Sequence, residues 1–335
     1  MSNFDNTRII CGNSHQKLCE EVSLLTGIKQ INCELQYFSN GEIRPIIPES
    51  VREKDIFLVQ TGTFTRIKSK RSVNDHLMEL FLLARTCKRS DARSITLIMP
   101  SYPYARQDKK DNPRGCISAR DIADLIEFSG IKRIICFDLH CAQIQGFFNI
   151  PCDNLYVHRL IREHLIKNIF KQDENIQDKY IIVSPDEGAL KKANSFAESF
   201  KLPLLVLSKD RDYTKLNQIS GMKIIGDTRV IKNKTAIIID DMCDTFGTIK
   251  KASENLAEYG VKNVILCITH GIFSGPAIER MNSSKYISHI ICSDTIPQHE
   301  NIKLCPKIQV YSIAKTVSQI VKRIVNGESI STLFD

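Results

Sequence analysis

The sequence of 335 residues predicts an α/β protein with two halves of similar size. Short runs of β-branched residues alternate with amphipathic segments at the spacing of strand–helix units. Several runs, such as Ala236–Ile239, are apolar throughout, as strands are in parallel sheets that are covered on both faces. The alternation starts again after Asn149–Asn154. We therefore expect two domains, residues 1–153 and 154–335, each with a mainly parallel sheet flanked by helices.

The elements can be placed from hydrophobic periodicity. The expected strands are Ile56–Gln60, Ile95–Met99, Arg133–Phe137, Tyr180–Val183, Leu204–Leu207, Thr235–Ile239, Val264–Thr269 and His289–Cys292. The expected helices are Asn74–Cys87, Ser118–Phe128, Tyr156–Ile169, Asp186–Phe200, Thr248–Tyr259, Pro276–Asn282 and Thr316–Asn326. Gly327 is expected to be the C-cap of the last helix, which we expect to pack back, within residues 315–335, on the N-terminal half. The polar segment Gln172–Asp178 is expected to be a surface loop.

Composition narrows the function classes. The chain has 42% hydrophobic and 25% charged residues, and its apolar runs are far shorter than the roughly 20 residues that a membrane span needs. The N-terminus lacks the apolar segment of a secretory signal. The formal charge of +8 is spread along the chain without a nucleic-acid-binding signature, and it equally suits anionic small substrates. We expect a cytoplasmic protein with no membrane and no nucleic-acid partner.

The twelve cysteines predict neither disulfides nor a zinc site. No Cys-x-x-Cys pair occurs, and several cysteines, such as Cys136 and Cys267, stand within strand-like runs, where a free cysteine behaves as a small hydrophobe. We expect reduced thiols, as in the cytosol.

The segment Ala236–Thr248 carries the clearest chemical signal. Four apolar residues form a strand, and Asp240 and Asp241 follow at its carboxyl end, where open α/β sheets bind ligands. Asp244–Thr248 then opens a helix, whose first N–H groups suit a phosphate. The two acids are placed to accept hydrogen bonds from vicinal sugar hydroxyls. The segment therefore predicts a site for a phosphorylated sugar, the plainer alternative being a strand followed by a capped helix.

This segment resembles the phosphoribosyl-diphosphate signature of type I phosphoribosyltransferases. Over nearly its whole length the chain resembles ribose-phosphate pyrophosphokinases of the phosphate-dependent, ADP-inhibited class. The matching stretches are Phe38–Glu42, Asn74–Glu79, Pro103–Lys110, Asp138–His140, Gln143–Phe148, Ser184–Asp186, Thr269–Pro276 and Asn326–Ser329.

The resemblance implies two tandem type I phosphoribosyltransferase-like domains and a defined reaction. The β,γ-diphosphate of Mg-ATP would pass to the C1 hydroxyl of D-ribose 5-phosphate, giving AMP and 5-phosphoribosyl 1-diphosphate for nucleotide biosynthesis. Mg²⁺ would be the cofactor. The residues that it assigns to ribose 5-phosphate are Asp240, Asp241, Asp244, Thr245, Phe246, Gly247 and Thr248.

The resemblance also assigns nucleotide and metal residues. Those for ATP are Phe38, Asn40, Glu42, Arg106, Gln107, Asp108 and His140. His140 and Asp186 would hold Mg²⁺, although this ion prefers oxygen ligands and an Asp before a helix is also a common N-cap. Lys209 and Arg211 would stabilise the transferring phosphoryl group, and in an extended backbone they point the same way.

The resemblance also assigns roles to two loops that contain the nucleotide residues. The polar run Asp108–Arg114 is similar to a mobile catalytic loop that excludes water. Phe38, Asn40 and Glu42 alternate, so an extended hairpin would put them on one face, where an aromatic ring stacks on adenine. Family assemblies supply this base site from a neighbouring subunit, which makes oligomerisation part of catalysis. By composition alone, each of these segments would pass for an ordinary surface loop or core contact.

Regulation and assembly are further expectations from the resemblance. Inorganic phosphate and ADP are the expected effectors, and a homo-oligomer, a hexamer built from dimers, is the expected assembly. The residues at the matching effector positions are Ser50, Arg52, Arg114, Gln145, Ser329, Ser331 and Phe334.

The chain departs from the family pattern at three places. The basic insert, residues 63–73, is longer than expected; Phe246 is bulkier than the usual residue of the sugar-phosphate loop; and Cys116 replaces a proline after the mobile loop. Three alternatives stay open: a non-catalytic regulatory subunit on the same scaffold, a phosphoribosyltransferase that acts on a base, and a nucleic-acid-binding protein that uses the basic insert.

Overall fold

The computed structural model describes residues 3–64, 71–171, 173–211 and 219–333, and for residues 209–211 and 219–222 it describes the backbone alone. The chain divides into two compact units. Unit 1 comprises Met1–Val157, Thr295–Pro297 and Ser312–Asp335, and unit 2 comprises His158–Asp294 and Gln298–Tyr311. The C-terminal segment therefore belongs to the same unit as the N-terminus.

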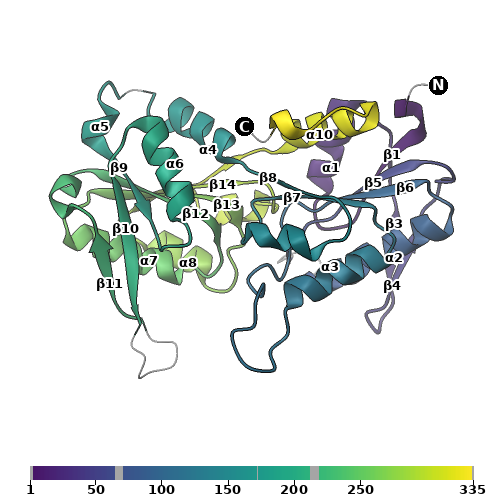
Figure 1. The fold of residues 1–335 in the computed structure, drawn as a ribbon, viewed down its shortest axis with the longest axis horizontal. Coiled ribbons are helices and arrows are strands. Elements are labelled where there is room, and N and C mark those ends of the chain that lie inside the picture. Colours follow the sequence, from purple (N-terminus) through teal and green to yellow (C-terminus); the bar gives the residue numbers. More distant parts are fainter. Residues whose placement is uncertain (1–2, 65–70, 172, 212–218, 334–335) are drawn as a thin grey trace. The chain divides into compact units, whose positions relative to one another are not determined.

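Unit 1 is built on a parallel sheet (Figure 1). Its described strands are, in spatial order, β2 (Gln30–Ile31), β1 (Thr7–Cys11), β5 (Asp55–Val59), β6 (Ser94–Ile98), β7 (Arg133–Phe137) and β8 (Cys152–Leu155). A separate antiparallel hairpin consists of β3 (Glu34–Tyr37) and β4 (Ile43–Ile46). The helices are η1 (Asn3–Asn6), α1 (Gln16–Thr26), α2 (Val73–Arg89), α3 (Ser118–Phe128), η2 (Ala142–Phe147), α10 (Ala314–Asn326) and η5 (Ser331–Leu333).

Unit 2 has a larger sheet, which is parallel except for one edge strand. The described strands are, in spatial order, β11 (Ile219–Ile225), β10 (Leu204–Arg211), β9 (Tyr180–Ser184), β12 (Thr235–Cys243), β13 (Asn263–Gly271), β14 (Ile287–Ser293) and β15 (Ile308–Tyr311), with β11 antiparallel to β10. The helices are α4 (His158–His164), the π-helix η3 (Leu165–Ile169), α5 (Ile176–Lys179), α6 (Leu190–Phe200), η4 (Thr228–Ile231), α7 (Gly247–Glu258), α8 (Ala277–Ser283) and α9 (His299–Leu304).

Each unit has its own hydrophobic core between sheet and helices. In unit 1, Leu80, Leu83 and Ala84 lie on one face of α2 and pack on the sheet, as the helical spacing of apolar residues requires. The start of α2 is fixed by a capping box, in which Ser72 and Asp75 satisfy each other's backbone N–H groups. Figure 1 shows α10 beside α1, and α10 ends at Gly327, whose φ of 70° is left-handed.

The α/β prediction is confirmed, and every predicted strand is present. Several predicted bounds are wrong. The helix predicted for Asp186–Phe200 begins at Leu190, and that predicted for Tyr156–Ile169 begins at His158 and becomes a π-helix at Leu165. The loop predicted for Gln172–Asp178 runs into α5, which begins at Ile176. Among the described helices, none is long and apolar enough to cross a membrane.

Candidate active site

The two predicted sugar-binding acids lie within β12, which extends to Cys243, so the prediction of a strand that stops before them was wrong. β12 pairs with β13 on one side as far as Cys243 and with β9 on the other as far as Ile238. Asp240 and Asp241 therefore stand beyond the end of the β9 pairing, and both are partly buried. The Asp240 carboxylate accepts from the Asp241 backbone N–H at 2.9 Å, which fixes its direction.

The electrostatic environment of Asp240 opposes its ionisation. Burial and the neighbouring carboxylate of Asp241 raise the pKa of Asp240 well above its usual value, and Asp186 adds to the effect. The backbone N–H of Asp241 acts in the opposite direction but is outweighed. Carboxylates that crowd together at the carboxyl end of a sheet are typical of sites that bind a cation or a hydroxyl-rich ligand.

The loop that follows β12 leads into the N-terminus of α7. Asp244 accepts a hydrogen bond from the Ser274 hydroxyl, and the Arg280 guanidinium donates to the Thr245 carbonyl at 2.9 Å. The N-cap residue of α7 makes no side-chain cap hydrogen bond. The first N–H groups of this 12-residue helix thus keep the capacity to bind an anion.

Phe246 occupies the left-handed position of this turn, and its side chain faces the core. The residue has φ 62° and is only 2% exposed, packed in the same cluster as Ile249 and Phe273. A left-handed backbone is strained for an aromatic residue, so burial of the ring is what compensates for it. Phe246 therefore does not narrow the loop, and only its backbone lies beside Gly247 and Thr248.

Asp186 lies in the turn between β9 and α6. Its carboxylate accepts from the Ala189 backbone N–H at 3.2 Å, and its carbonyl accepts from the Ser184 hydroxyl at 2.7 Å. Because β9 and β12 are adjacent in the sheet, Asp186 and Asp240 come from neighbouring strand ends. Among the described residues no three His, Cys, Asp or Glu side chains form a complete metal cage.

Lys209 and Arg211 lie at the end of β10, the neighbour of β9 on the other side. The backbone is extended there, with Lys209 paired to Met222 and a register shift between Asp210 and Arg211. The side chains of both residues lie outside the described part of the structure, so their common direction stays a prediction.

The predicted base site in unit 1 is the tight turn of the β3–β4 hairpin, and the expectation of an extended run over Phe38–Glu42 was wrong. Phe38 donates its N–H to the Glu42 carbonyl at 2.9 Å, and Gly41 turns the chain at φ 91°. The Asn40 side chain accepts from the Glu42 N–H at 3.1 Å. The Phe38 ring is 50% exposed at this turn, a position that suits stacking on a base.

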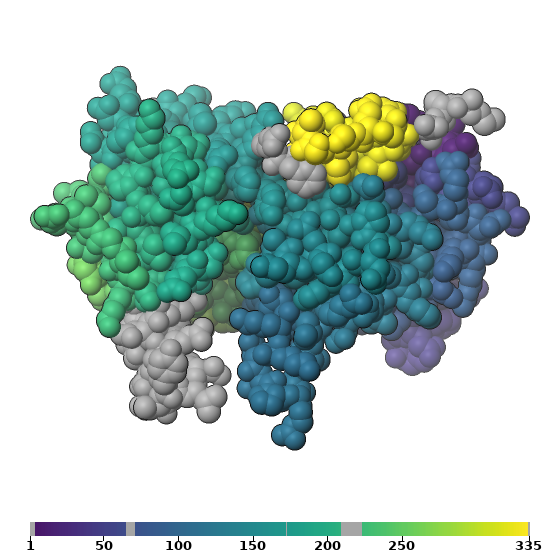
Figure 2. All heavy atoms as spheres, in the orientation of Figure 1, coloured from purple at the N-terminus to yellow at the C-terminus, as the bar shows by residue number. Residues whose placement is uncertain are grey.

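The predicted triphosphate residues Arg106, Gln107 and Asp108 begin an exposed loop before α3, which projects from the surface of unit 1 in Figure 2. The base of the loop is fixed: the Gln107 side chain accepts from the Ser118 hydroxyl at 2.6 Å. Cys116 lies beside the same hydroxyl at 3.0 Å. Cys116, which stands where the family pattern has proline, therefore contacts the hydroxyl that fixes the base of this loop.

His140 follows β7 through a strained turn. Asp138 is buried with φ 40°, and its carboxylate accepts from the Val157 N–H at 3.1 Å. Leu139 donates its N–H to the Asn154 side chain at 3.0 Å. These bonds hold the turn and leave the His140 side chain exposed at the surface of unit 1.

Most predicted effector residues are exposed or half-buried in unit 1. Arg52 forms an ion pair with Asp91 at 3.6 Å, and the Ser329 and Ser331 hydroxyls lie 2.7 Å apart. Ser50 and Arg114 lie in loops, and Gln145 lies in η2. Phe334 and residues 65–70 of the basic insert lie outside the described residues.

Sequence reasoning missed Arg280, one helical turn after the Thr269–Pro276 stretch. Its side chain holds the Thr245 carbonyl, and its Nη1 atom would lie 3.1 Å from a Cβ at Gly247. A larger residue at Gly247 would therefore press on this contact. The only signal in the sequence was a basic residue on a short helix, which by itself indicates nothing.

Known proteins share this arrangement. Residues 7–130 match the N-terminal domain of ribose phosphate pyrophosphokinase, and residues 213–335 match the phosphoribosyl synthetase-associated domain. Ribose-phosphate pyrophosphokinase A of Dictyostelium discoideum is 40% identical over 330 residues, which cover 98% of both chains. The chain belongs to the ribose-phosphate pyrophosphokinase family. Ribose-phosphate pyrophosphokinase 2 of Schizosaccharomyces pombe is also 40% identical over 98% of both chains.

A solved member of the family has the same fold. The crystal structure of phosphoribosylpyrophosphate synthetase from Mycobacterium smegmatis superposes with a TM-score of 0.84 at 34% identity, covering 96% of this chain and 99% of that one. The predicted family and the predicted fold class, two tandem type I phosphoribosyltransferase-like domains, are thereby confirmed.

Proposed function

We propose that this chain transfers the β,γ-diphosphate of Mg-ATP to the C1 hydroxyl of ribose 5-phosphate, giving 5-phosphoribosyl 1-diphosphate and AMP for nucleotide biosynthesis. The observation that carries this is the β12–α7 segment in a chain that matches the family from end to end. Its nine residues from Asp240 to Thr248 supply two features: crowded carboxylates, and a helix N-terminus that has no side-chain cap.

In this proposal unit 2 binds the sugar phosphate. Asp240 and Asp241 accept hydrogen bonds from the vicinal hydroxyls, and ionised acceptors make such bonds strong. The backbone N–H groups of Thr245–Thr248 bind the 5-phosphate at the positive end of α7. Arg280 holds the loop in this shape through the Thr245 carbonyl.

Unit 1 binds the nucleotide. The exposed ring of Phe38 stacks on the base, while Asn40 and Glu42 recognise its polar edge. Arg106, Gln107 and Asp108 receive the triphosphate, for which the Arg fork offers paired donors.

Mg²⁺ fits the donors that are present. One or two carboxylates together with substrate phosphates and water are the usual ligands of this ion in proteins, and the carboxylate of Asp186 suits that role. Asp186 and His140 are the residues that would hold the ion. When bound, the ion neutralises charge on the phosphate oxygens.

The chain's own residues act mainly by positioning and charge. The bond from the sugar O1 to the β-phosphorus forms, and the bond from that phosphorus to the α-phosphate oxygen breaks. AMP leaves with the electron pair, and the hydroxyl proton passes to solvent. Lys209 and Arg211 stabilise the charge that develops on the transferring group. The loop 108–114 excludes water, which would otherwise compete with the hydroxyl.

We further propose that inorganic phosphate and ADP regulate the enzyme through Ser50, Arg52, Arg114, Gln145, Ser329, Ser331 and Phe334. In this proposal the chain works in the cytoplasm as a homo-oligomer, a hexamer built from dimers.

Phosphorus NMR tests the reaction directly. The purified protein is mixed with ribose 5-phosphate and Mg-ATP, with and without inorganic phosphate. We expect AMP and a C1-linked diphosphate sugar, formed faster with phosphate. A folded protein that forms neither product under both conditions would favour the non-catalytic regulatory subunit instead.

A further inference from the structure

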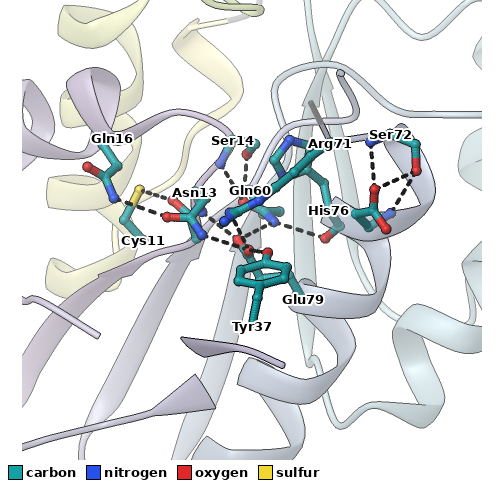
Figure 3. A network of polar contacts seen from close by, with 12 residues as sticks. Cys11, Asn13, Ser14, Gln16, Tyr37, Gln60, Arg71, Ser72, His76 and Glu79 are labelled. Atoms are coloured by element: carbon teal, nitrogen blue, oxygen red, sulfur yellow. Dashed lines mark hydrogen bonds and ion pairs between the residues drawn. The ribbon is translucent and has the colours of Figure 1, made fainter. Parts of the chain in front are cut away.

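A buried polar network in unit 1 surrounds the carboxylate of Glu79, which lies on α2 and is fully buried (Figure 3). The Asn13 backbone and side-chain amides donate to it at 2.5 and 3.0 Å, and the Gln60 side-chain amide donates at 3.0 Å. The Tyr37 hydroxyl donates at 2.6 Å. The network therefore joins α2 to the loop after β1, to the end of β5 and to the end of β3.

The contacts are those of an ionised carboxylate, because all four are made by donors. A buried charge is tolerated only when such donors and a counter-ion replace its water. Arg71 supplies the counter-ion: its Nη1 atom lies 3.5 Å from the Glu79 carboxylate, and its guanidinium carbon lies 3.7 Å from the centre of the Tyr37 ring. Tyr37 is thus held at its hydroxyl by Glu79 and on its face by Arg71 (Figure 3).

Tyr37 stands at a decisive position, because it is the last residue of β3 and directly precedes Phe38. The β3–β4 hairpin is a separate two-stranded sheet. Such hairpins are marginally stable unless they pack on another element. Here β4 packs on α2, and the Tyr37–Glu79 bond fixes the end of the hairpin from which the turn Phe38–Glu42 projects.

The same helix contacts the second nucleotide loop. The Tyr104 hydroxyl donates to the Asn74 side chain near the start of α2 at 2.5 Å. Tyr104 has a left-handed backbone with φ 59°, and its carbonyl accepts a hydrogen bond from the Gln107 N–H at 2.9 Å. This bond fixes the start of the loop. The two loops assigned to ATP are therefore both fixed to α2.

We infer that Tyr37 and Glu79 are positioning residues for the nucleotide base. The inference rests on the proposed function, since it assumes that the turn Phe38–Glu42 binds adenine. Glu79 does not touch the nucleotide; it orients Tyr37, and Tyr37 orients the turn. Loss of the hydroxyl should loosen the base site and leave the binding of phosphates unchanged.

Calorimetric titration can separate these effects. Tyr37→Phe removes one oxygen and keeps the ring under Arg71. The ligands are Mg-ATP and inorganic tripolyphosphate, which has the phosphates but no base. We expect the Kd for ATP to rise about tenfold, as for a lost hydrogen bond to a charged group, and the Kd for tripolyphosphate to stay within about twofold.

Tyr180→Phe is the matched control. The Tyr180 hydroxyl also donates to a carboxylate, that of Asp173, at 2.6 Å, but in unit 2. This variant should leave both dissociation constants unchanged. Glu79→Gln, a second variant of the same volume, should weaken ATP binding in the same direction as Tyr37→Phe.

Three results would overturn the inference: unchanged ATP binding in Tyr37→Phe, an equal loss of tripolyphosphate binding, or an equal effect of Tyr180→Phe. Because titration does not depend on turnover, these results are distinct from a failure of the proposed reaction. That failure would show as absent product in the NMR measurement on the wild-type protein.

Discussion

Each unit holds an acid with a distinctive environment, and the two environments are opposite in kind. In unit 1, Glu79 is fully buried, but four hydrogen-bond donors and Arg71 surround its carboxylate. In unit 2, Asp240 stands beside other acids, and burial together with the carboxylates of Asp241 and Asp186 raises its pKa.

The difference shows what each acid is for. A carboxylate whose acceptor sites are already filled by the protein stabilises the fold and orients its donors. Carboxylates that crowd together raise one another's energy until a cation or a set of hydroxyl donors binds. Burial alone would single out Glu79, whereas the partners of each carboxylate separate this structural acid from the crowded acids that we propose bind the sugar.

The largest effect on stability should come from Glu79→Ala. The change leaves buried amides, a hydroxyl and Arg71 without their common acceptor, so we expect the free energy of unfolding to fall by about 3 kcal/mol in chemical denaturation. Glu163→Ala is the control, because Glu163 forms an exposed ion pair with Arg159 and should change little. A loss below about 1 kcal/mol for Glu79→Ala would show that the network is not structural.

Asp240→Asn should have a smaller effect of the opposite sign. Removing one of the crowded charges should stabilise the ligand-free protein by about 1 kcal/mol, seen as a higher Tm, since one pKa unit corresponds to about that energy. Asp227→Asn is the matched control in unit 2: Arg229 lowers the pKa of Asp227 to about 2, so its loss should not raise the Tm. A Tm of Asp240→Asn below that of the wild type would contradict the comparison.

The smallest effect concerns His76, beside Glu79 on α2. Burial lowers its pKa, Arg71 acts in the same direction, and Glu79 and Asp75 oppose it. The unfolded chain therefore binds a proton more readily, and stability falls as the pH drops through about 6.5.

Comparing the wild type with His76→Gln isolates the contribution of His76 to the pH dependence of stability. Between pH 7 and 6 the wild type should lose about 0.5 kcal/mol more than the variant, with His299→Gln, which alters an exposed histidine, as the control. Equal slopes in wild type and His76→Gln would show that His76 does not titrate as its burial indicates.

Much of the fold followed from the sequence, because strands buried on both faces leave continuous apolar runs. Arg133–Phe137 and Ser118–Phe128 were predicted with the bounds that the structure has. Some of the missed elements, β2, β11 and β15, are edge strands that carry little periodicity, but the inner strand β1 and the 11-residue helix α1 were missed as well. Phe38–Glu42 was misjudged because alternation within five residues fits a turn as well as a strand.

The site was less predictable, since its support comes from common residues distant in sequence. Nothing marks Asn13, Tyr37 and Gln60 as partners of Glu79 until the fold brings them together. The burial of the Phe246 ring was likewise hidden, because its direction depends on a left-handed backbone at one residue.

Calorimetric titration of ribose 5-phosphate into wild type and Asp240→Asn tests the central claim most directly. The account predicts binding to the wild type and a Kd at least about tenfold higher for the variant, because a charged acceptor of the sugar hydroxyls is lost. Equal dissociation constants would show that the crowded carboxylates of unit 2 do not bind the sugar, and would contradict the assignment.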